Sequence, residues 1–95
     1  MKQPAVYILT NRWNGTLYTG VTSNLAGRVW QHRNGIASAF TTRHGCKHLV
    51  WFERHETMID AITREKQIKA GSRLAKIQLI AKTNPQWQDL YNEIM

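Results

Sequence analysis

The stretch AVYILTNRWNGTLYTGVT, residues 5–22, decides the fold because it holds two strand-forming runs joined by a turn signal. Residues 6–11 and 17–22 are rich in Val, Ile, Leu, Tyr and Thr, the residue types favoured in strands. Asn14-Gly15 lies between the two runs, and a glycine there can adopt the positive φ that a tight connection over residues 12–15 requires. The stretch therefore predicts an antiparallel β-hairpin.

The length of the hairpin loop decides whether two tyrosines share a face of the sheet. With a four-residue loop, Tyr7 pairs with Gly20, and Tyr18 lies one diagonal step away. Diagonal neighbours are about 7–8 Å apart, close enough for two phenol rings to interact. A three-residue loop would put them on opposite faces. The alternative to a functional pair is that each is an ordinary strand aromatic.

The remaining chain predicts helices around a third strand. Ser23 or Asn24 can cap a helix that runs to about residue 34, where Gly35 ends it. Residues 36–47 show no period and are expected to form an ordered loop. Residues 48–52, HLVWF, read as a strand that is apolar on both faces, so we expect it in the centre of the sheet.

Three further helices are predicted after this strand. Thr57 caps a helix that ends at Gly71, and Ser72 caps one that runs to Lys82. Asn84-Pro85 reads as an N-cap followed by proline in the first helical position, which predicts a last short helix to Ile94. The expected fold is α+β, a small three-stranded antiparallel sheet flanked by helices, as a single domain over residues 1–95.

Composition narrows the class of protein. The chain has 95 residues of which 42% are apolar, and no apolar run approaches the roughly 18 residues of a membrane span. No signal-peptide core is evident, and a lone Cys46 fits a reducing compartment, so a cytoplasmic protein is expected. The net charge of +7 favours a polyanionic partner, nucleic acid before a membrane surface. A basic surface that aids solubility alone is the simpler alternative.

Two residues of the first helix suit phosphate chemistry. Arg28 and His32 are one helical turn apart and project together, at the border of the apolar stripe. Arginine binds phosphate with two parallel hydrogen bonds, and histidine can transfer a proton near neutral pH. A histidine bonded to backbone would be the structural alternative for His32.

Glu65 is a carboxylate expected on the apolar face of the helix over residues 57–71. A buried carboxylate is costly unless it is paired or binds a metal ion. With one inward carboxylate, at most one Mg²⁺ or Mn²⁺ is expected. A salt bridge, for example to Arg28, would need no metal, and Lys69 on the same face can extend outward to solvent. The residues that define this face are Met58, Ala61, Ile62 and Ile68.

Two further patterns could indicate a zinc site and a base-stacking residue. His44, Cys46 and His48 alternate as possible zinc ligands, but no fourth ligand follows at a suitable spacing, so a loop with a buried cysteine is preferred. Trp13 at the hairpin tip is a candidate for stacking on a base, whereas Trp51 is expected in the core.

Taken together, these residues resemble the GIY-YIG nuclease superfamily, and specifically its small single-domain bacterial branch. The resemblance runs from Ala5 to about Leu90 and includes both strand motifs, GVTSNLAGRVWQHR, AITREKQIK around Glu65, and NPQWQDL. Ala5, Val6 and Thr19 depart from the tripeptide motifs, but none of these changes removes a reactive group.

The resemblance implies catalytic roles for five residues, with Glu65 as metal ligand: Tyr7, Tyr18, Arg28, His32 and Glu65. It implies metal-dependent hydrolysis of DNA, leaving 5′-phosphate and 3′-hydroxyl ends; whether Tyr7 or His32 is the base stays open. Small relatives of this kind suggest single-stranded DNA as substrate. Branched or duplex DNA, RNA, and a non-catalytic nucleic-acid-binding module or repair adaptor are the alternatives. The residues expected to contact substrate are Trp13, Thr41, Thr42, Arg43, Lys69 and Asn84.

Overall fold

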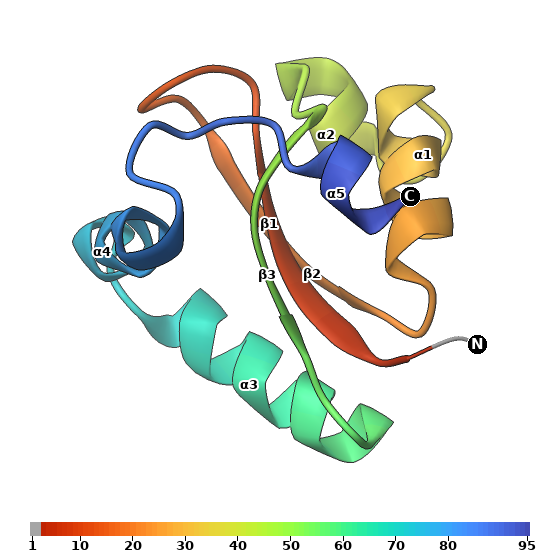
Figure 1. The fold of residues 1–95 in the computed structure, drawn as a ribbon. Coiled ribbons are helices and arrows are strands. Elements are labelled where there is room, and N and C mark those ends of the chain that lie inside the picture. The colour runs from red at the N-terminus through yellow and green to blue at the C-terminus, as the bar shows by residue number, and fades with distance from the viewer. Residues whose placement is uncertain (1–2) are drawn as a thin grey trace.

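The computed structural model describes residues 3–95, so the first two residues of the predicted domain lie outside it. It has the predicted α+β class, with three antiparallel strands and five helices in the described residues. Figure 1 shows the sheet between α1, α2 and α5 on one side and α3 and α4 on the other. The elements are β1 (Ala5–Thr10), β2 (Leu17–Thr22), α1 (Leu25–Arg33), α2 (Ala39–His44), β3 (His48–Arg54), α3 (Met58–Ala70), α4 (Arg73–Thr83) and α5 (Tyr91–Ile94).

The hairpin pairs in the register expected for a four-residue loop, but the positive φ in the turn is at Asn14 (55°) and not at Gly15. Tyr7 pairs with Gly20 and Leu9 pairs with Tyr18, so Tyr7 and Tyr18 are diagonal neighbours on one face of the sheet. The turn is held by the Asn11 side chain, which accepts a hydrogen bond from the Thr16 N–H at 2.9 Å.

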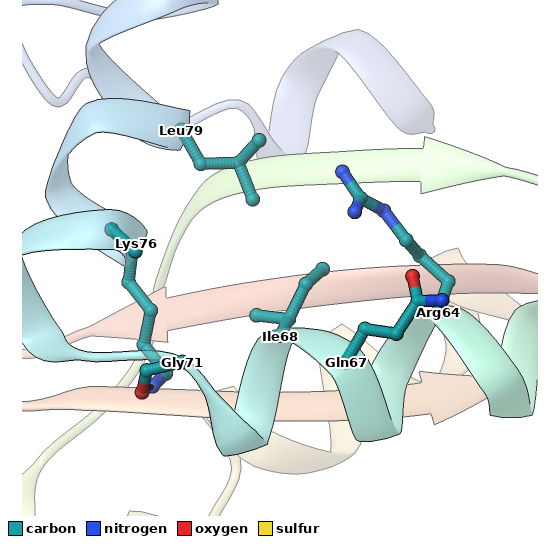
Figure 2. Close-up of a pocket in the computed structure, with 7 residues that line it drawn as sticks. Arg64, Gln67, Ile68, Gly71, Lys76 and Leu79 are labelled. Atoms are coloured by element: carbon teal, nitrogen blue, oxygen red, sulfur yellow. Dashed lines mark hydrogen bonds between the residues drawn. The ribbon is translucent and has the colours of Figure 1, made fainter.

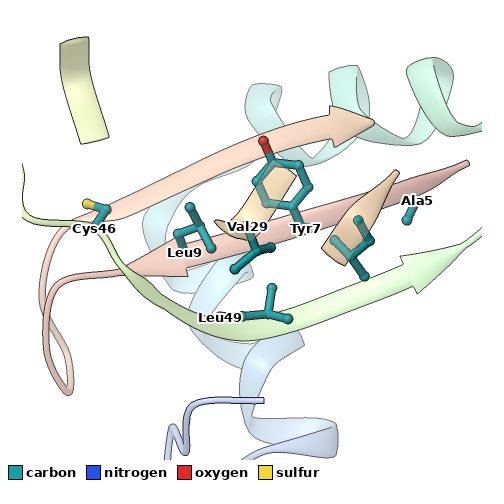
Figure 3. Close-up of a cluster of buried hydrophobic side chains, with 7 residues drawn as sticks. Ala5, Tyr7, Leu9, Val29, Cys46 and Leu49 are labelled. Atoms are coloured by element: carbon teal, nitrogen blue, oxygen red, sulfur yellow. The ribbon is translucent and has the colours of Figure 1, made fainter. Parts of the chain in front are cut away.

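The sheet has hydrophobic residues packed on both faces because the residues of β1 alternate between two cores. Ala5, Tyr7 and Leu9 pack on the α1 side, and Val6 and Ile8 on the side of α3 and α4. The first of these clusters is shown in Figure 3. All six residues of β1 are buried, as expected for a strand covered on both sides.

The expectation that the third strand is central is wrong. The strand order is β2-β1-β3, so β1 is central and β3 is an edge strand. Leu49, Val50 and Trp51 are nevertheless buried, because helices or the C-terminal segment cover both faces of β3. An apolar run on both faces indicates burial, which an edge strand also has when it is covered on both sides.

The predicted loop over residues 36–47 contains a short helix, α2. Ser38 caps it by accepting a hydrogen bond from the Thr41 N–H, and Gly45 ends it with a φ of 67°. Six residues are too few to show a helical period in the sequence, so the cap and the glycine were the available signals.

The caps predicted for α3 and α4 are confirmed at Thr57 and Ser72, whose side chains accept hydrogen bonds from backbone N–H groups three residues on. The prediction that Asn84 begins the last helix is wrong, because Asn84 is the C-cap of α4. Residues 85–90 form a turn followed by irregular chain, and α5 covers only Tyr91–Ile94.

No helix in the described residues has the length and apolar character needed to cross a bilayer.

Candidate active site

The Tyr7 phenol lies across β2 and reaches toward α1. Figure 3 shows its ring extending from β1, with the hydroxyl directed away from the Ala5 and Leu49 side chains. It can cross β2 because Gly20 has no side chain. A Cβ at residue 20 would lie 2.5 Å from Tyr7 Cζ, too close for the ring to keep its place. The Tyr7 ring can therefore occupy this position only because residue 20 is a glycine.

A hydrogen-bonded chain connects Tyr7 to α2 through His32. The Tyr7 hydroxyl is 2.8 Å from His32 Nε2, and His32 Nδ1 is 2.9 Å from Thr41 Oγ1. The Thr41 hydroxyl donates in turn to the Ser38 carbonyl at 3.2 Å. His32 and Thr41 are 1% and 0% exposed, so this chain is shielded from solvent.

The direction of these hydrogen bonds fixes the histidine tautomer. Because Thr41 donates its only hydroxyl proton to Ser38, its oxygen accepts from His32 Nδ1–H. His32 Nε2 then carries a lone pair and accepts from the Tyr7 hydroxyl. The Tyr7 oxygen is left with its own lone pairs free.

The environment holds both Tyr7 and His32 in their neutral forms. Burial, together with the nearby Arg28 charge, lowers the pKa of His32 from 6.5 to about 4. Burial and the neighbouring Tyr18 raise the pKa of Tyr7 well above its ordinary value. At neutral pH the pair is an imidazole with a free Nε2 and an intact phenol.

Arg28 and Glu65 both act electrostatically on Tyr7. The positive charge of Arg28 opposes the rise in the pKa of Tyr7, and the negative charge of Glu65 adds to it. Arg28 is exposed on α1, whereas Glu65 comes from α3 on the other side of the sheet. The fold thus brings the charges of two distant helices to the same phenol.

Glu65 is a largely buried carboxylate paired with one cationic neighbour. Its Oε2 lies 2.9 Å from Lys69 Nζ, and its side chain is 13% exposed. The salt bridge considered from sequence therefore exists, but with Lys69 on the next helical turn as partner.

Tyr18 belongs to an aromatic cluster around the hydrogen-bonded chain. Its ring centroid lies 6.4 Å from that of Tyr7 and 5.2 Å from that of His32. On its other side, Phe40 of α2 lies 5.8 Å away. Phe40 was not identified from sequence, because residues 36–47 were expected to be a loop. The Ser38 cap was the signal that could have located it.

The other residues expected to contact substrate fall into three groups. Trp13 is 68% exposed at the hairpin tip, and Thr42 and Arg43 are exposed on α2. Lys69 is half exposed beside Glu65. Thr41 is fully buried and bonds His32, so it is not accessible to a substrate and is placed to orient the imidazole.

Asn84 is not brought to this site. It is buried, and its side chain donates to the carbonyls of Val50 and Gln88 and accepts from the Gln88 N–H. Val50 belongs to β3, which is the edge of the sheet opposite to β2. Asn84 therefore fastens the chain after α4 to the sheet.

A separate crevice lies between α3 and α4 (Figure 2). It has a volume of about 170 Å³ and is bordered by Ile68, Leu79 and Lys76 among others. None of the five predicted catalytic residues lines it.

Comparison with known proteins gives a consistent result. The family model described as the GIY-YIG catalytic domain matches residues 3–78. The chain is 38% identical over 89 residues to the UPF0213 protein CPE1444 of Clostridium perfringens, which covers 94% of this chain and 95% of the relative. It is 37% identical over 67 residues to a UPF0213 protein of Staphylococcus aureus strain Mu3, covering 70% and 82% of the two chains.

A solved structure is also similar. The solution NMR structure of the UPF0213 protein BH0048 from Bacillus halodurans aligns with a TM-score of 0.58 and 28% identity, over 92% of each chain. The names of these relatives state no activity or substrate. The family match covers most of the chain, and it includes both strands of the hairpin, α1 and Glu65. The chain therefore belongs to the GIY-YIG catalytic domain family.

Proposed function

We propose that this protein is a metal-dependent endonuclease that hydrolyses DNA phosphodiester bonds, preferentially in single strands. The observation that carries the proposal is the buried chain from Tyr7 through His32 to Thr41, with the charges of Arg28 and Glu65 acting on the same phenol. Membership of a nuclease family and the net charge of +7 support a nucleic-acid substrate.

The donor set fits one hard divalent ion. In residues 3–95 no three His, Cys, Asp or Glu side chains gather as a metal cluster, so Glu65 would be the protein's single anionic ligand. Mg²⁺ accepts such an arrangement because it retains several waters and takes phosphate oxygens as ligands. Mn²⁺ also suits carboxylate and water ligands. When bound, the ion would neutralise charge on the scissile phosphate and on the leaving 3′ oxygen.

Tyr7 and His32 would activate the attacking water together. The Tyr7 oxygen accepts a proton from water while the phenol proton passes to His32 Nε2, 2.8 Å away. The low pKa of His32 keeps Nε2 unprotonated at neutral pH, so its lone pair stays on the Tyr7 hydroxyl. Because His32 Nε2 bonds the Tyr7 hydroxyl, the phenol would lie between the imidazole and the attacking water.

The remaining residues would bind the phosphate. The Arg28 guanidinium is exposed and suited to hold the charge that develops as water oxygen attacks phosphorus. Tyr18 would position the phosphate from β2. The phosphorus–O3′ bond breaks, which leaves a 5′-phosphate, and the departing 3′ oxygen takes a proton from solvent water to become the 3′-hydroxyl.

Cleavage of end-labelled single-stranded and duplex DNA, with Mg²⁺ or Mn²⁺ and with a chelator, tests the proposal. We expect metal-dependent cutting by the wild type, faster on single strands, and its loss in Glu65→Gln and Arg28→Ala. Glu56→Gln is the matched control because Glu56 is exposed outside the site. A wild-type protein that binds nucleic acid but cuts none of single-stranded DNA, duplex DNA, branched DNA and RNA would favour a non-catalytic binding module instead.

A further inference from the structure

A groove runs along β2, the free edge of the sheet, beginning beside the tyrosine pair. It consists of two adjoining hollows of about 300 and 320 Å³ that share Leu17 and Lys76. We call it the β2 groove. The hollow next to the active site is bordered by Tyr18, Phe40 and Lys69, and the farther hollow by Thr16 and Arg73.

Two cations of the β2 groove, Arg73 and Lys76, are held in place and remain available to an anion, whereas Lys69 is paired with Glu65. Arg73 donates hydrogen bonds to the carbonyls of Asn14 at 2.9 Å and Gly15 at 2.7 Å. These bonds fix its guanidinium against the loop between β1 and β2. Lys76 donates to the Gly71 carbonyl at 2.7 Å. Within the described chain neither forms an ion pair with a carboxylate, and no Asp or Glu lines either hollow.

Phe40 gives the β2 groove an exposed aromatic wall. It is 43% exposed although it is a phenylalanine, and its ring is braced by Tyr18 at 5.8 Å and His44 at 4.5 Å. A further hollow lies on its other side, bordered by Arg43 and His44. An aromatic ring supported by two neighbouring rings and flanked by cations has the features of a base-stacking platform.

We propose that the β2 groove binds an unpaired segment of the substrate strand next to the scissile phosphate, with one base stacked on Phe40. The inference rests on the proposed nuclease function and deepens it, since it says which part of the protein favours single strands. Phosphates on one side of that base contact Lys69, Lys76 and Arg73.

The dimensions of the β2 groove fit a short piece of strand. The hollows border the chain from Thr16, just before β2, to Thr19, about 10 Å of chain, which corresponds to two or three phosphates of a nucleic-acid strand. A base within a duplex is stacked on its neighbours and paired, so it cannot also stack on Phe40. The preference for an unpaired strand follows from this platform.

Fluorescence anisotropy with a labelled single-stranded oligonucleotide, in a chelator so that nothing is cut, tests the platform. We expect Phe40→Leu to weaken binding between about 5-fold and 150-fold, the range for loss of one stacked base, and Phe40→Trp to retain it. Trp30→Leu is the control, because Trp30 is an aromatic of similar exposure, 51%, that lines none of these hollows. Thermal unfolding of each variant checks that the fold is intact.

Salt dependence tests the phosphate contacts. Lys76→Gln should lower the slope of log Kd against log salt by about 0.7, the value for one phosphate contact on a single strand. Lys82→Gln, on the same helix but outside the groove, should leave the slope unchanged.

The outcomes separate this inference from the nuclease proposal. If single-strand binding depends on Phe40 but the wild type cuts no substrate, the binding role of the β2 groove is supported and the nuclease function is overturned. Suppose that the wild type cuts DNA and that Phe40→Leu binds single strands as tightly as Trp30→Leu does. This result would overturn the proposed role of the β2 groove and leave the nuclease function standing. An equal loss of duplex and single-strand binding in Phe40→Leu, or no binding by the wild type, would also overturn it.

Discussion

The Tyr7 hydroxyl donates a hydrogen bond to His32 Nε2 across 2.8 Å, although the two residues are 25 positions apart in the chain. The bond is buried, and both partners are neutral at physiological pH because burial raises the pKa of Tyr7 and lowers that of His32. The bond connects the phenol directly to the imidazole, with no solvent between them. This pair is the centre of the proposed mechanism.

Removal of the Tyr7 hydroxyl is expected to abolish turnover and preserve substrate binding. Tyr7→Phe keeps the buried ring but removes the atom that accepts the water proton, so the cleavage rate should fall by about 10²–10⁴-fold. Single-turnover cleavage and anisotropy measure the two properties separately. Tyr91→Phe, on α5 and outside the site, is the matched control. Turnover within a few-fold of wild type in Tyr7→Phe would rule out this role.

Thr41 is expected to act by positioning His32. Thr41→Val has nearly the same shape but leaves His32 Nδ1–H without an acceptor, which costs about 1–3 kcal/mol of stability or shifts the tautomer. The ¹⁵N shifts of the His32 ring report which nitrogen carries the proton. We expect mixed or inverted tautomers in Thr41→Val with reduced cleavage, and recovery of both in Thr41→Ser. Unchanged ring shifts in Thr41→Val would argue against the assigned hydrogen-bond direction.

His32 is expected to make the protein less stable in acid. The unfolded chain protonates this ring below about pH 6.5, whereas the folded protein does so only near pH 4, so protons favour the unfolded state between these values. Its contribution is complete above pH 6.5 and lost progressively as the pH falls, by up to roughly 3 kcal/mol. An NMR titration of the ring measures the folded pKa directly. In Arg28→Gln that pKa should rise, since the Arg28 charge lowers it; a fall would contradict the assignment.

Gly20 is expected to tolerate no side chain. In Gly20→Ala the new Cβ would lie 2.5 Å from Tyr7 Cζ, so the phenol must move away from His32. Overpacking of this kind costs about 1–3 kcal/mol of stability. Cleavage should fall at least tenfold at temperatures where the variant is folded, as shown by its circular dichroism. Full activity in a folded Gly20→Ala would mean that the position of the Tyr7 ring is not needed.

Asp89 is expected to fasten the C-terminal segment to α1 and β3. It accepts from Arg33 at 2.6 Å and from the Leu49 and Tyr91 N–H groups at 3.2 and 3.1 Å. Burial alone would raise its pKa, but these hydrogen bonds lower it overall. Its contribution to stability is therefore present above the ordinary pKa of 3.8 and lost as the pH falls through the lower folded value.

Urea denaturation of Asp89→Asn at neutral pH should show a loss of about 1–2 kcal/mol, which shrinks in acid. The exposed Asp60→Asn is the control and should change stability much less. A loss that is equal at neutral pH and near pH 2 would show that the charge of Asp89 is not responsible.

Local signals in the sequence predicted the parts of the fold that depend on neighbouring residues. The turn signal at Asn14-Gly15 and the alternation around it gave the register that pairs Tyr7 with Gly20, because hairpin pairing follows from loop length. The caps at Thr57 and Ser72 were correct for the same reason, since a cap involves three or four consecutive residues. The resemblance to a known family was confirmed by the comparisons.

The sequence by itself determined the α+β class, the hairpin register, the basic charge and a short set of candidate residues. The tertiary structure alone decided that β1 is the central strand, that Asn84 lies at the opposite edge from the site, and that Thr41 is buried against His32. It also brought Phe40 beside Tyr18. Strand order and the docking of α2 depend on contacts between distant segments, and these leave no periodic pattern in a short stretch of chain.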